Sequence, residues 1–150
     1  VIAEAKWPVQ GVSTGLPVLI VPVRTLTAVR SIVPNDKAIV DLCGRFGTNG
    51  LMVFTTVTVE PFATVHARMF APGLGIAEDP ATGSAVAAFA GVLMAHDHMR
   101  DGAHMFLIEQ GYEMGRPSLI SLGIDVLDGK LMEARIGGSA VLVQEGTLHL

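Results

Sequence analysis

The chain has 150 residues, of which 50% are apolar, 16% charged and 5% aromatic, and its net charge is −4. Disordered chains are charged and poor in apolar residues, so this composition excludes disorder. No apolar run reaches the roughly 20 residues that span a bilayer, so no membrane partner is expected. The 10 basic residues are scattered rather than clustered, which argues against nucleic-acid partners. We expect one domain over residues 1–150, with more apolar surface than a lone domain of this length usually has.

The cysteine content predicts the cellular compartment, and the first residues raise the question whether the chain is a fragment. Cys43 is the single cysteine, so no internal disulfide forms and a reducing, cytoplasmic setting is expected. The sequence does not start with a basic segment followed by an apolar one, so we expect no signal peptide. The chain begins Val-Ile-Ala-Glu without methionine. Either removal of an initiator methionine or a fragment of a longer protein would explain that beginning.

Alternating and β-branched segments predict a strand-rich chain. The strands are expected over residues 18–23, 51–60, 64–70, 104–109, 118–126, 131–136 and 140–144. Pro22 has no N–H to donate, which favours an edge strand or a bulge. Asn35 and Asp36 offer an N-cap for a helix that runs to about residue 45, and the glycines from position 47 end it. Asp128 and Gly129 predict a hairpin turn.

A second helix is expected over residues 85–95, where every residue is apolar or glycine. A helix that is apolar all round is buried on all sides, and this one is too short to cross a membrane. The simplest arrangement is a curved, mostly antiparallel, barrel-like sheet wrapped around this central helix. The predicted fold class is therefore α+β.

Acid, hydroxyl and glycine residues crowd together just before this helix. Pro80 suits a first helical position, which makes Asp79 the natural N-cap and Thr82 a second candidate. Gly83 and Ser84 would then present free backbone N–H groups at the positive end of the helix, where a carboxylate or phosphate binds readily. The hydroxyls of Thr82 and Ser84 would add hydrogen bonds to the same anion. The other interpretation is that Asp79 merely caps a helix and the glycine serves packing. The Gly-Lys-Ser/Thr of a phosphate-binding loop is absent.

The cysteine and the histidines suggest no further chemistry. Cys43 lies late in a predicted helix, where the dipole does not favour a thiolate, so a structural, half-buried thiol is expected. His96, His98 and His104 lack an acidic partner at a clear spacing, and no metal site is expected. His66 lies in a strand pattern and is expected to be a surface or packing residue.

The motif before the apolar helix resembles the signature of the phenazine-biosynthesis PhzF-like family. The resemblance extends over most of the chain in the family's order. It rests on VSTGLPVLIVPV (12–23), RMFAPGLGI (68–76), EDPATGSA (78–85), EQGYEMGRPSLI (109–120) and GGSAVLVQEGTL (137–148). These segments correspond to the family's C-terminal half. Members of the family resemble diaminopimelate epimerase, with two lobes that each place a curved sheet around a central helix and an active site between them.

The resemblance implies an isomerase that removes and returns a proton on a small carboxylated substrate, without metal or organic cofactor. It assigns Asp79 as the active-site aspartate and Gly83 and Ser84 as residues that hold the substrate carboxylate. Thr82 belongs to the same substrate-binding motif. Arg116 lies in another of the matching segments, and we expect no more of it than a structural salt bridge.

The family's principal acid/base glutamate and its supporting histidine belong to the N-terminal half, whose motifs are absent from this chain. Glu78 belongs to the C-terminal motif and is not taken as their substitute. We therefore expect half a site, completed by the missing lobe or by a second copy in a homo-oligomer such as a dimer. The apolar excess would lie partly on the face that meets this partner. The alternative is a non-catalytic domain that binds a small anion or associates with itself.

Overall fold

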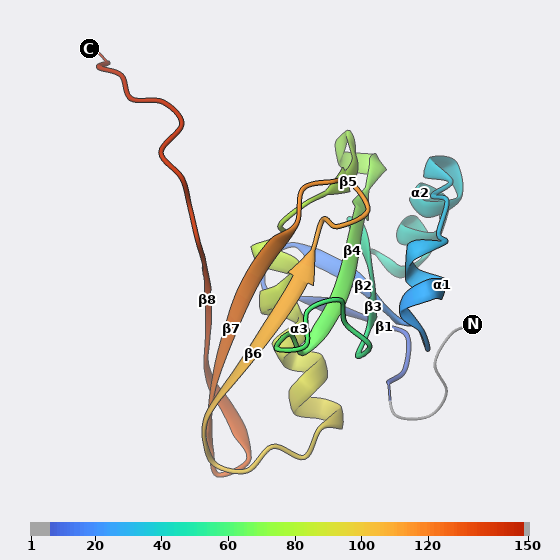
Figure 1. The fold of residues 1–150 in the computed structure, drawn as a ribbon. Helices are drawn as coiled ribbons and strands as arrows, with labels where there is room; N and C mark the ends of the chain where they lie inside the picture. Colours follow the sequence, from blue (N-terminus) through green and yellow to red (C-terminus); the bar gives the residue numbers. More distant parts are fainter. Residues whose placement is uncertain (1–6, 149–150) are drawn as a thin grey trace.

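The computed structural model describes residues 7–148 of the chain. The described residues form three α-helices and eight strands, and the strands belong to one sheet, which is curled (Figure 1). In chain order the elements are β1 (Gln10–Ser13), β2 (Pro17–Pro22), α1 (Leu26–Arg30), α2 (Asp36–Phe46), β3 (Gly50–Thr55), β4 (Val65–Ala71), the 3-10 turn η1 (Pro72–Leu74), β5 (Ile76–Asp79), α3 (Gly83–His96), β6 (Gly102–Gln110), β7 (Ser118–Leu127) and β8 (Lys130–Gly138).

The strands follow the order β1-β2-β3-β4-β6-β7-β8, and β5 pairs with β4 beside this path. Two neighbouring pairs, β2 with β3 and β4 with β6, are parallel. The other five pairs are antiparallel. The predicted α+β class with a curved, mostly antiparallel sheet is confirmed.

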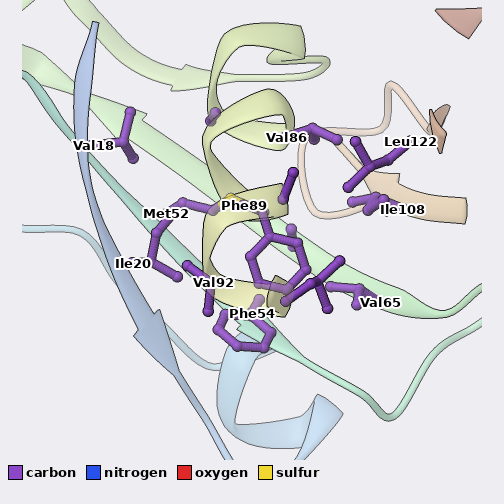
Figure 2. Close-up of a cluster of buried hydrophobic side chains, with 14 of the residues drawn as sticks. Val18, Ile20, Met52, Phe54, Val65, Val86, Phe89, Val92, Ile108 and Leu122 are labelled. Atoms are coloured by element: carbon purple, nitrogen blue, oxygen red, sulfur yellow. The ribbon is translucent and has the colours of Figure 1, made fainter. Parts of the chain in front are cut away.

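Side chains that alternate along the strands give the sheet two apolar faces. Helix α3 packs on one face, where Phe89 lies against Phe54 with the ring centroids 4.8 Å apart (Figure 2). Helices α1 and α2 pack on the opposite face. Their smaller core consists of Val23, Val29, Ile39, Cys43, Val53 and Phe70. Each face of the central strands is therefore covered by helix.

Helix α3 is apolar as expected, yet the prediction that it is buried on all sides is wrong. Phe89 and Val92 are fully buried, whereas Gly91 and Ala95 are exposed. The curled sheet covers only part of the helix circumference, so small residues suffice on the remaining side. None of the helices that the structure describes is long and apolar enough to cross a membrane.

Local signals in the first half were predicted with mixed success. Helix α2 begins where expected, with the side chain of Asn35 accepting from the Ala38 N–H, and it ends at Gly47 with φ 64°. Strand β2 is not an edge, because it pairs with both β1 and β3. Pro22 is the last residue of β2, so its missing N–H falls where the strand ends. Strand β3 stops at Thr55, whose hydroxyl accepts from the Val57 N–H, and residues 56–60 are not strand.

The predicted hairpin between β7 and β8 is confirmed, with φ 52° at Asp128 and 67° at Gly129. The strand predicted over residues 140–144 is absent from the structure. From residue 139 to residue 148 the chain leaves the sheet and runs outward (Figure 1). Its large apolar side chains, including Val141 at 85% and Val143 at 92%, remain exposed. A strand needs a hydrogen-bonding neighbour, and no described strand lies beside this segment.

Candidate active site

The motif residues lie in the short connection between β5 and α3. Asp79 is the last residue of β5, where it pairs with Met69 of β4, and α3 begins only at Gly83. The expectation that Asp79 caps the helix and that Pro80 begins it is therefore wrong. Sheet pairing keeps Asp79 extended, so the chain needs three more residues before it turns into the helix. Thr82 occupies the N-cap position, but its side chain makes no capping hydrogen bond.

A chain of hydrogen bonds explains why Thr82 does not cap. Its hydroxyl lies 2.6 Å from Oδ2 of Asp79. Nε2 of Gln110 donates to the same hydroxyl at 2.9 Å and to the main-chain oxygen of Asp79 at 2.6 Å. The Thr82 N–H donates in return to Oε1 of Gln110 at 3.3 Å. The buried Gln110 side chain thus fixes the whole connection from the β6 side.

Gly83 and Ser84 are the first two residues of α3. This is the position that the sequence motif predicted for an anion site at the start of the helix. An open cleft of about 580 Å³ lies beside this helix start. It is lined by Ala81, Gly83, Pro117, Ser118, Leu119, Ile120, Ile136, Gly137, Gly138 and Ser139. Asp79, Thr82 and Ser84 are not among the lining residues. The hydroxyl of Thr14, in the turn between β1 and β2, reaches the Ser84 carbonyl oxygen at 3.4 Å.

The opposite face of the sheet holds a buried ionic cluster around His66. Its Nδ1 lies 2.6 Å from Oε1 of Glu109, and its Nε2 lies 2.9 Å from Oε1 of Glu113. Glu109 also accepts from the N–H groups of Val59 and Glu60, at 2.6 and 2.9 Å. His66 is fully buried, so the alternative of a surface position is wrong and the packing one holds.

Tyr112 borders this cluster, with its ring centroid 5.8 Å from that of His66. Its hydroxyl donates to Oε1 of Glu60 at 3.2 Å. Burial, followed by the negative charges of Glu60 and Glu109, raises the pKa of the Tyr112 phenol. The hydroxyl therefore stays protonated and keeps donating across the neutral range.

The remaining candidates have structural surroundings. Cys43 is 5% exposed, more buried than expected, within the apolar core under α2. His104 contacts the Arg100 carbonyl oxygen through Nε2 at 2.7 Å, and the His96 ring meets Trp7 edge-on. Within residues 7–148, no three His, Cys, Asp or Glu side chains are arranged to hold a metal. The salt bridge expected of Arg116 is not found in the same part of the chain.

Sequence reasoning missed Gln110 and the glycine that follows it. An adjacent polar pair, Glu109 and Gln110, ends a mostly apolar strand, and consecutive strand residues point to opposite faces. Both are fully buried, so each needs a partner on its own face. Gly111 has φ 80°, and a Cβ there would lie 2.9 Å from the Pro80 carbonyl oxygen. This polar pair followed by glycine was the available signal for a contact with the Asp79 segment.

Comparison with known proteins now decides the family. Residues 2–146 match the PhzC-PhzF family, described as phenazine biosynthesis-like protein. The chain belongs to this family. It is 44% identical over 141 residues to an uncharacterized isomerase of Mesorhizobium japonicum, a match that covers 92% of this chain and 47% of that protein. The resemblance inferred from the sequence motifs is confirmed.

Two further members support the assignment. The chain is 27% identical over 153 residues to the trans-2,3-dihydro-3-hydroxyanthranilate isomerase of Pseudomonas chlororaphis, covering 99% of this chain and 50% of that one. The crystal structure of a PhzF-family phenazine biosynthesis protein of Bacillus anthracis matches with a TM-score of 0.81 at 26% identity. That match covers 93% of this chain and 48% of the other. The chain thus spans about half the length of these relatives.

Proposed function

We propose that this chain supplies half of the active site of an isomerase or epimerase that moves a proton on a small carboxylated metabolite. The observation that carries the proposal is the fixed position of the Asp79 carboxylate, held by Thr82 directly before the first turn of α3. The names of the curated relatives support isomerase chemistry. In this proposal α3 is the central helix of one lobe of a diaminopimelate epimerase-like fold.

Each site residue has a role that follows from its surroundings. The first backbone N–H groups of α3, at Gly83 and Ser84, have no helical partners of their own and hold the substrate carboxylate. They steady the negative charge that develops when a neighbouring carbon loses its proton. Oδ1 of Asp79 makes no hydrogen bond to any of residues 7–148, so it is open to orient or relay the moving proton.

Catalysis requires an acid/base group from outside this chain. Such a group must lie within hydrogen-bond reach of the proton that it moves. Glu78 is next to Asp79 in sequence, but both of its carboxylate oxygens bind Arg68. We propose that the other half of the two-lobe protein supplies the acid/base group and that residues 1–150 alone are inactive.

The face that meets the partner is proposed to include β8 and the segment 139–148 after it. All nine residues of β8 are exposed, and Met132 and Ile136 present apolar side chains at 62% and 39% exposure. This surface also forms one wall of the cleft beside Gly83, so a partner seated on it would close the cleft. We propose that the second lobe occupies this surface. The alternative is a homodimer in which a second copy of the chain lies there. Sedimentation of residues 1–150 as a strict monomer would exclude the homodimer.

Deuterium incorporation tests the function. The protein translated from the complete reading frame is incubated in D2O with trans-2,3-dihydro-3-hydroxyanthranilate and, separately, with LL-diaminopimelate. Mass spectrometry follows the isotope in the recovered compound. We expect incorporation with one of them, and a fall of about 100-fold or more in Asp79→Ala, the usual scale for a proton-transfer group. Asp41→Ala, an acidic side chain on the exposed face of α2, should exchange at the wild-type rate.

Two results of the deuterium experiment would contradict the isomerase proposal, and one binding result would favour the second candidate. No deuterium in either compound, or unchanged exchange in Asp79→Ala, contradicts the isomerase proposal. Binding of anthranilate in calorimetry without any exchange would instead support the second candidate, a non-catalytic anion-binding domain. That candidate is favoured by the open cleft beside the helix start, which this chain builds without an acid/base partner. For either function we propose a cytoplasmic protein, because the single thiol forms no internal disulfide.

A further inference from the structure

We infer that Gln110 is a positioning residue for Asp79, and that it sets the direction of a hydrogen-bond chain from its amide through the Thr82 hydroxyl to the Asp79 carboxylate. The inference rests on the proposed role of Asp79. It also moves Thr82 from the substrate-binding group, where the family resemblance placed it, to the group that orients the aspartate.

The orientation of the Gln110 amide follows from its three contacts. Nε2 faces two oxygens, the main-chain oxygen of Asp79 at 2.6 Å and Oγ1 of Thr82 at 2.9 Å. Oε1 faces the Thr82 N–H at 3.3 Å. A flipped amide would oppose oxygen to the Asp79 carbonyl and N–H to the Thr82 N–H, losing both of those bonds, and it could keep the third only by taking the Thr82 hydroxyl proton away from Asp79. The amide is fully buried, so water cannot replace them.

This orientation fixes the single hydroxyl proton of Thr82. Both protons of the Gln110 amide are donated, so Oγ1 of Thr82 accepts one of them and keeps its own proton for another acceptor. That acceptor is Oδ2 of Asp79 at 2.6 Å, a distance typical of a hydroxyl that donates to a carboxylate. With its proton committed, Thr82 has none to donate to a substrate carboxylate. Oδ1 of Asp79 is the oxygen left to face the substrate.

The sheet holds both ends of this chain of bonds. Strand β4 pairs with β3 along one edge; along its other edge it pairs first with β6, where Ala67 is opposite Gln110, and then with β5, where Met69 is opposite Asp79. Asp79 and Gln110 therefore lie on the same edge of β4, opposite positions two residues apart along it. A rigid strand fixes their separation better than a flexible loop would, and errors of about 1 Å in placing a reacting group cost on the order of 100-fold in rate.

Two pairs of variants test the inference in the protein translated from the complete reading frame. Thr82→Ser keeps the hydroxyl, whereas Thr82→Val keeps the shape and removes it. Gln110→Glu replaces the donating nitrogen by an oxygen that attracts the Thr82 proton away from Asp79. Gln10→Glu is the matched control, because Nε2 of Gln10 has no hydrogen-bond partner within residues 7–148 and Gln10 lies on β1.

We expect kcat for deuterium exchange to fall at least 10-fold in Thr82→Val and Gln110→Glu. The substrate is trans-2,3-dihydro-3-hydroxyanthranilate, or LL-diaminopimelate if the wild-type protein exchanges that compound instead. KM should stay within about 2-fold, because the residues that hold the carboxylate are untouched. Thr82→Ser should retain more of kcat than Thr82→Val because it keeps the hydroxyl, and Gln10→Glu should keep wild-type kcat. A raised KM in Thr82→Val with unchanged kcat would overturn the inference and return Thr82 to substrate binding.

A readout without turnover separates this inference from the proposed function. In the NMR spectrum of the same protein, the Thr82 hydroxyl proton should be resolved and protected from solvent exchange, and Gln110→Glu should change its shift while Gln10→Glu should not. An exchange-broadened hydroxyl proton in the wild type overturns the inference even if the enzyme turns over. A protected proton that responds to Gln110→Glu, in a protein that exchanges neither compound, upholds the hydrogen-bond chain and contradicts only the proposed function.

Discussion

Arg68 of β4 and Glu78 of β5 form a largely buried, bidentate ion pair, with Nε to Oε1 at 2.8 Å and Nη2 to Oε2 at 2.9 Å. Nη1 of Arg68 also donates to the carbonyl oxygens of Val29 and Ile32, so the guanidinium connects β5 to the end of α1. Glu78 therefore anchors the strand that ends at Asp79. The role that we propose at the site belongs to its neighbour Asp79, because both carboxylate oxygens of Glu78 already bind Arg68.

Removal of the Glu78 carboxylate should destabilise the fold. In Glu78→Ala the Arg68 side chain, 6% exposed, would keep a buried charge without a carboxylate partner on β5. We expect the free energy of unfolding to fall by about 3 kcal/mol or more, the usual scale when one partner of a buried pair is removed. Urea denaturation followed by circular dichroism measures the change.

The matched control is Asp41→Ala on α2. Asp41 pairs with Lys37 at 3.0 Å, but its side chain is 56% exposed. Exposed pairs four residues apart on a helix contribute about 0.5 kcal/mol or less. Equal losses in Glu78→Ala and Asp41→Ala would show that the Arg68 pair does not stabilise the fold as we argue.

The His66 cluster should show strong coupling between its members. His66→Leu leaves the carboxylates of Glu109 and Glu113 buried without the ring, and we expect a loss of about 3 kcal/mol in the free energy of unfolding. Glu113→Gln in the same chain removes the carboxylate that faces Nε2 of the ring. The double variant should therefore be more stable than the sum of the single losses predicts, by at least about 0.5 kcal/mol. Strict additivity in urea denaturation would contradict the coupled cluster.

Gly111→Ala should be more damaging than a positive φ alone explains. Its new Cβ would collide with the carbonyl oxygens of Pro80 and Arg116, both main-chain atoms. Gly115→Ala is the matched control, because Gly115 has φ 68° but open space at the Cβ position. We expect a loss of about 1 kcal/mol for Gly115→Ala and about 3 kcal/mol or more for Gly111→Ala. Similar urea midpoints for the two variants would rule out the steric argument.

The turn between β7 and β8 should weaken in acid through Asp101. The N–H of Gly129 and then that of Asp128 hold the pKa of the Asp101 carboxyl below its ordinary value of 3.8. The folded state thus binds this proton less readily than the unfolded chain. The stabilisation is complete above the ordinary pKa and is lost as pH falls through the lower, folded-state pKa.

Asp101→Asn provides the measurement. The difference in unfolding free energy between wild type and variant should be constant from pH 8 to about pH 5 and should shrink below about pH 4. A wild-type advantage that stays constant down to pH 2 would contradict the assignment to the Asp101 carboxyl.

Features decided by a few neighbouring residues were predictable. Asn35 and Gly47 bound α2 because a side-chain acceptor at one end and a left-handed glycine at the other satisfy the helix ends locally. Asp128 and Gly129 made the hairpin for the same reason, since each tolerates positive φ. The strand expected over residues 140–144 failed because a strand depends on a neighbour that its own residues do not specify.

The candidate site was half predictable. The motif from Asp79 to Ser84 was located by its composition, and the structure places Gly83 and Ser84 at the start of α3 as that motif required. The prediction that Asp79 caps the helix failed because pairing with β4 continues the strand through Asp79, in the extended conformation that a residue before a proline prefers. Gln110 escaped notice because it lies 31 positions from the aspartate whose carbonyl it holds.

The sequence by itself determined the α+β class, the family, the apolar helix and an apolar excess too large for a lone domain. Only the tertiary structure decided where that excess lies: one side of α3 is left open, and β8 with the segment after it exposes apolar side chains. Only the tertiary structure also revealed the hydrogen bonds of His66 with Glu109, 43 positions away, and of Gln110 with Asp79. The physical reason is strand order. The parallel pairing of β4 with β6 brings distant residues within hydrogen-bond distance, and no short-range propensity encodes that pairing.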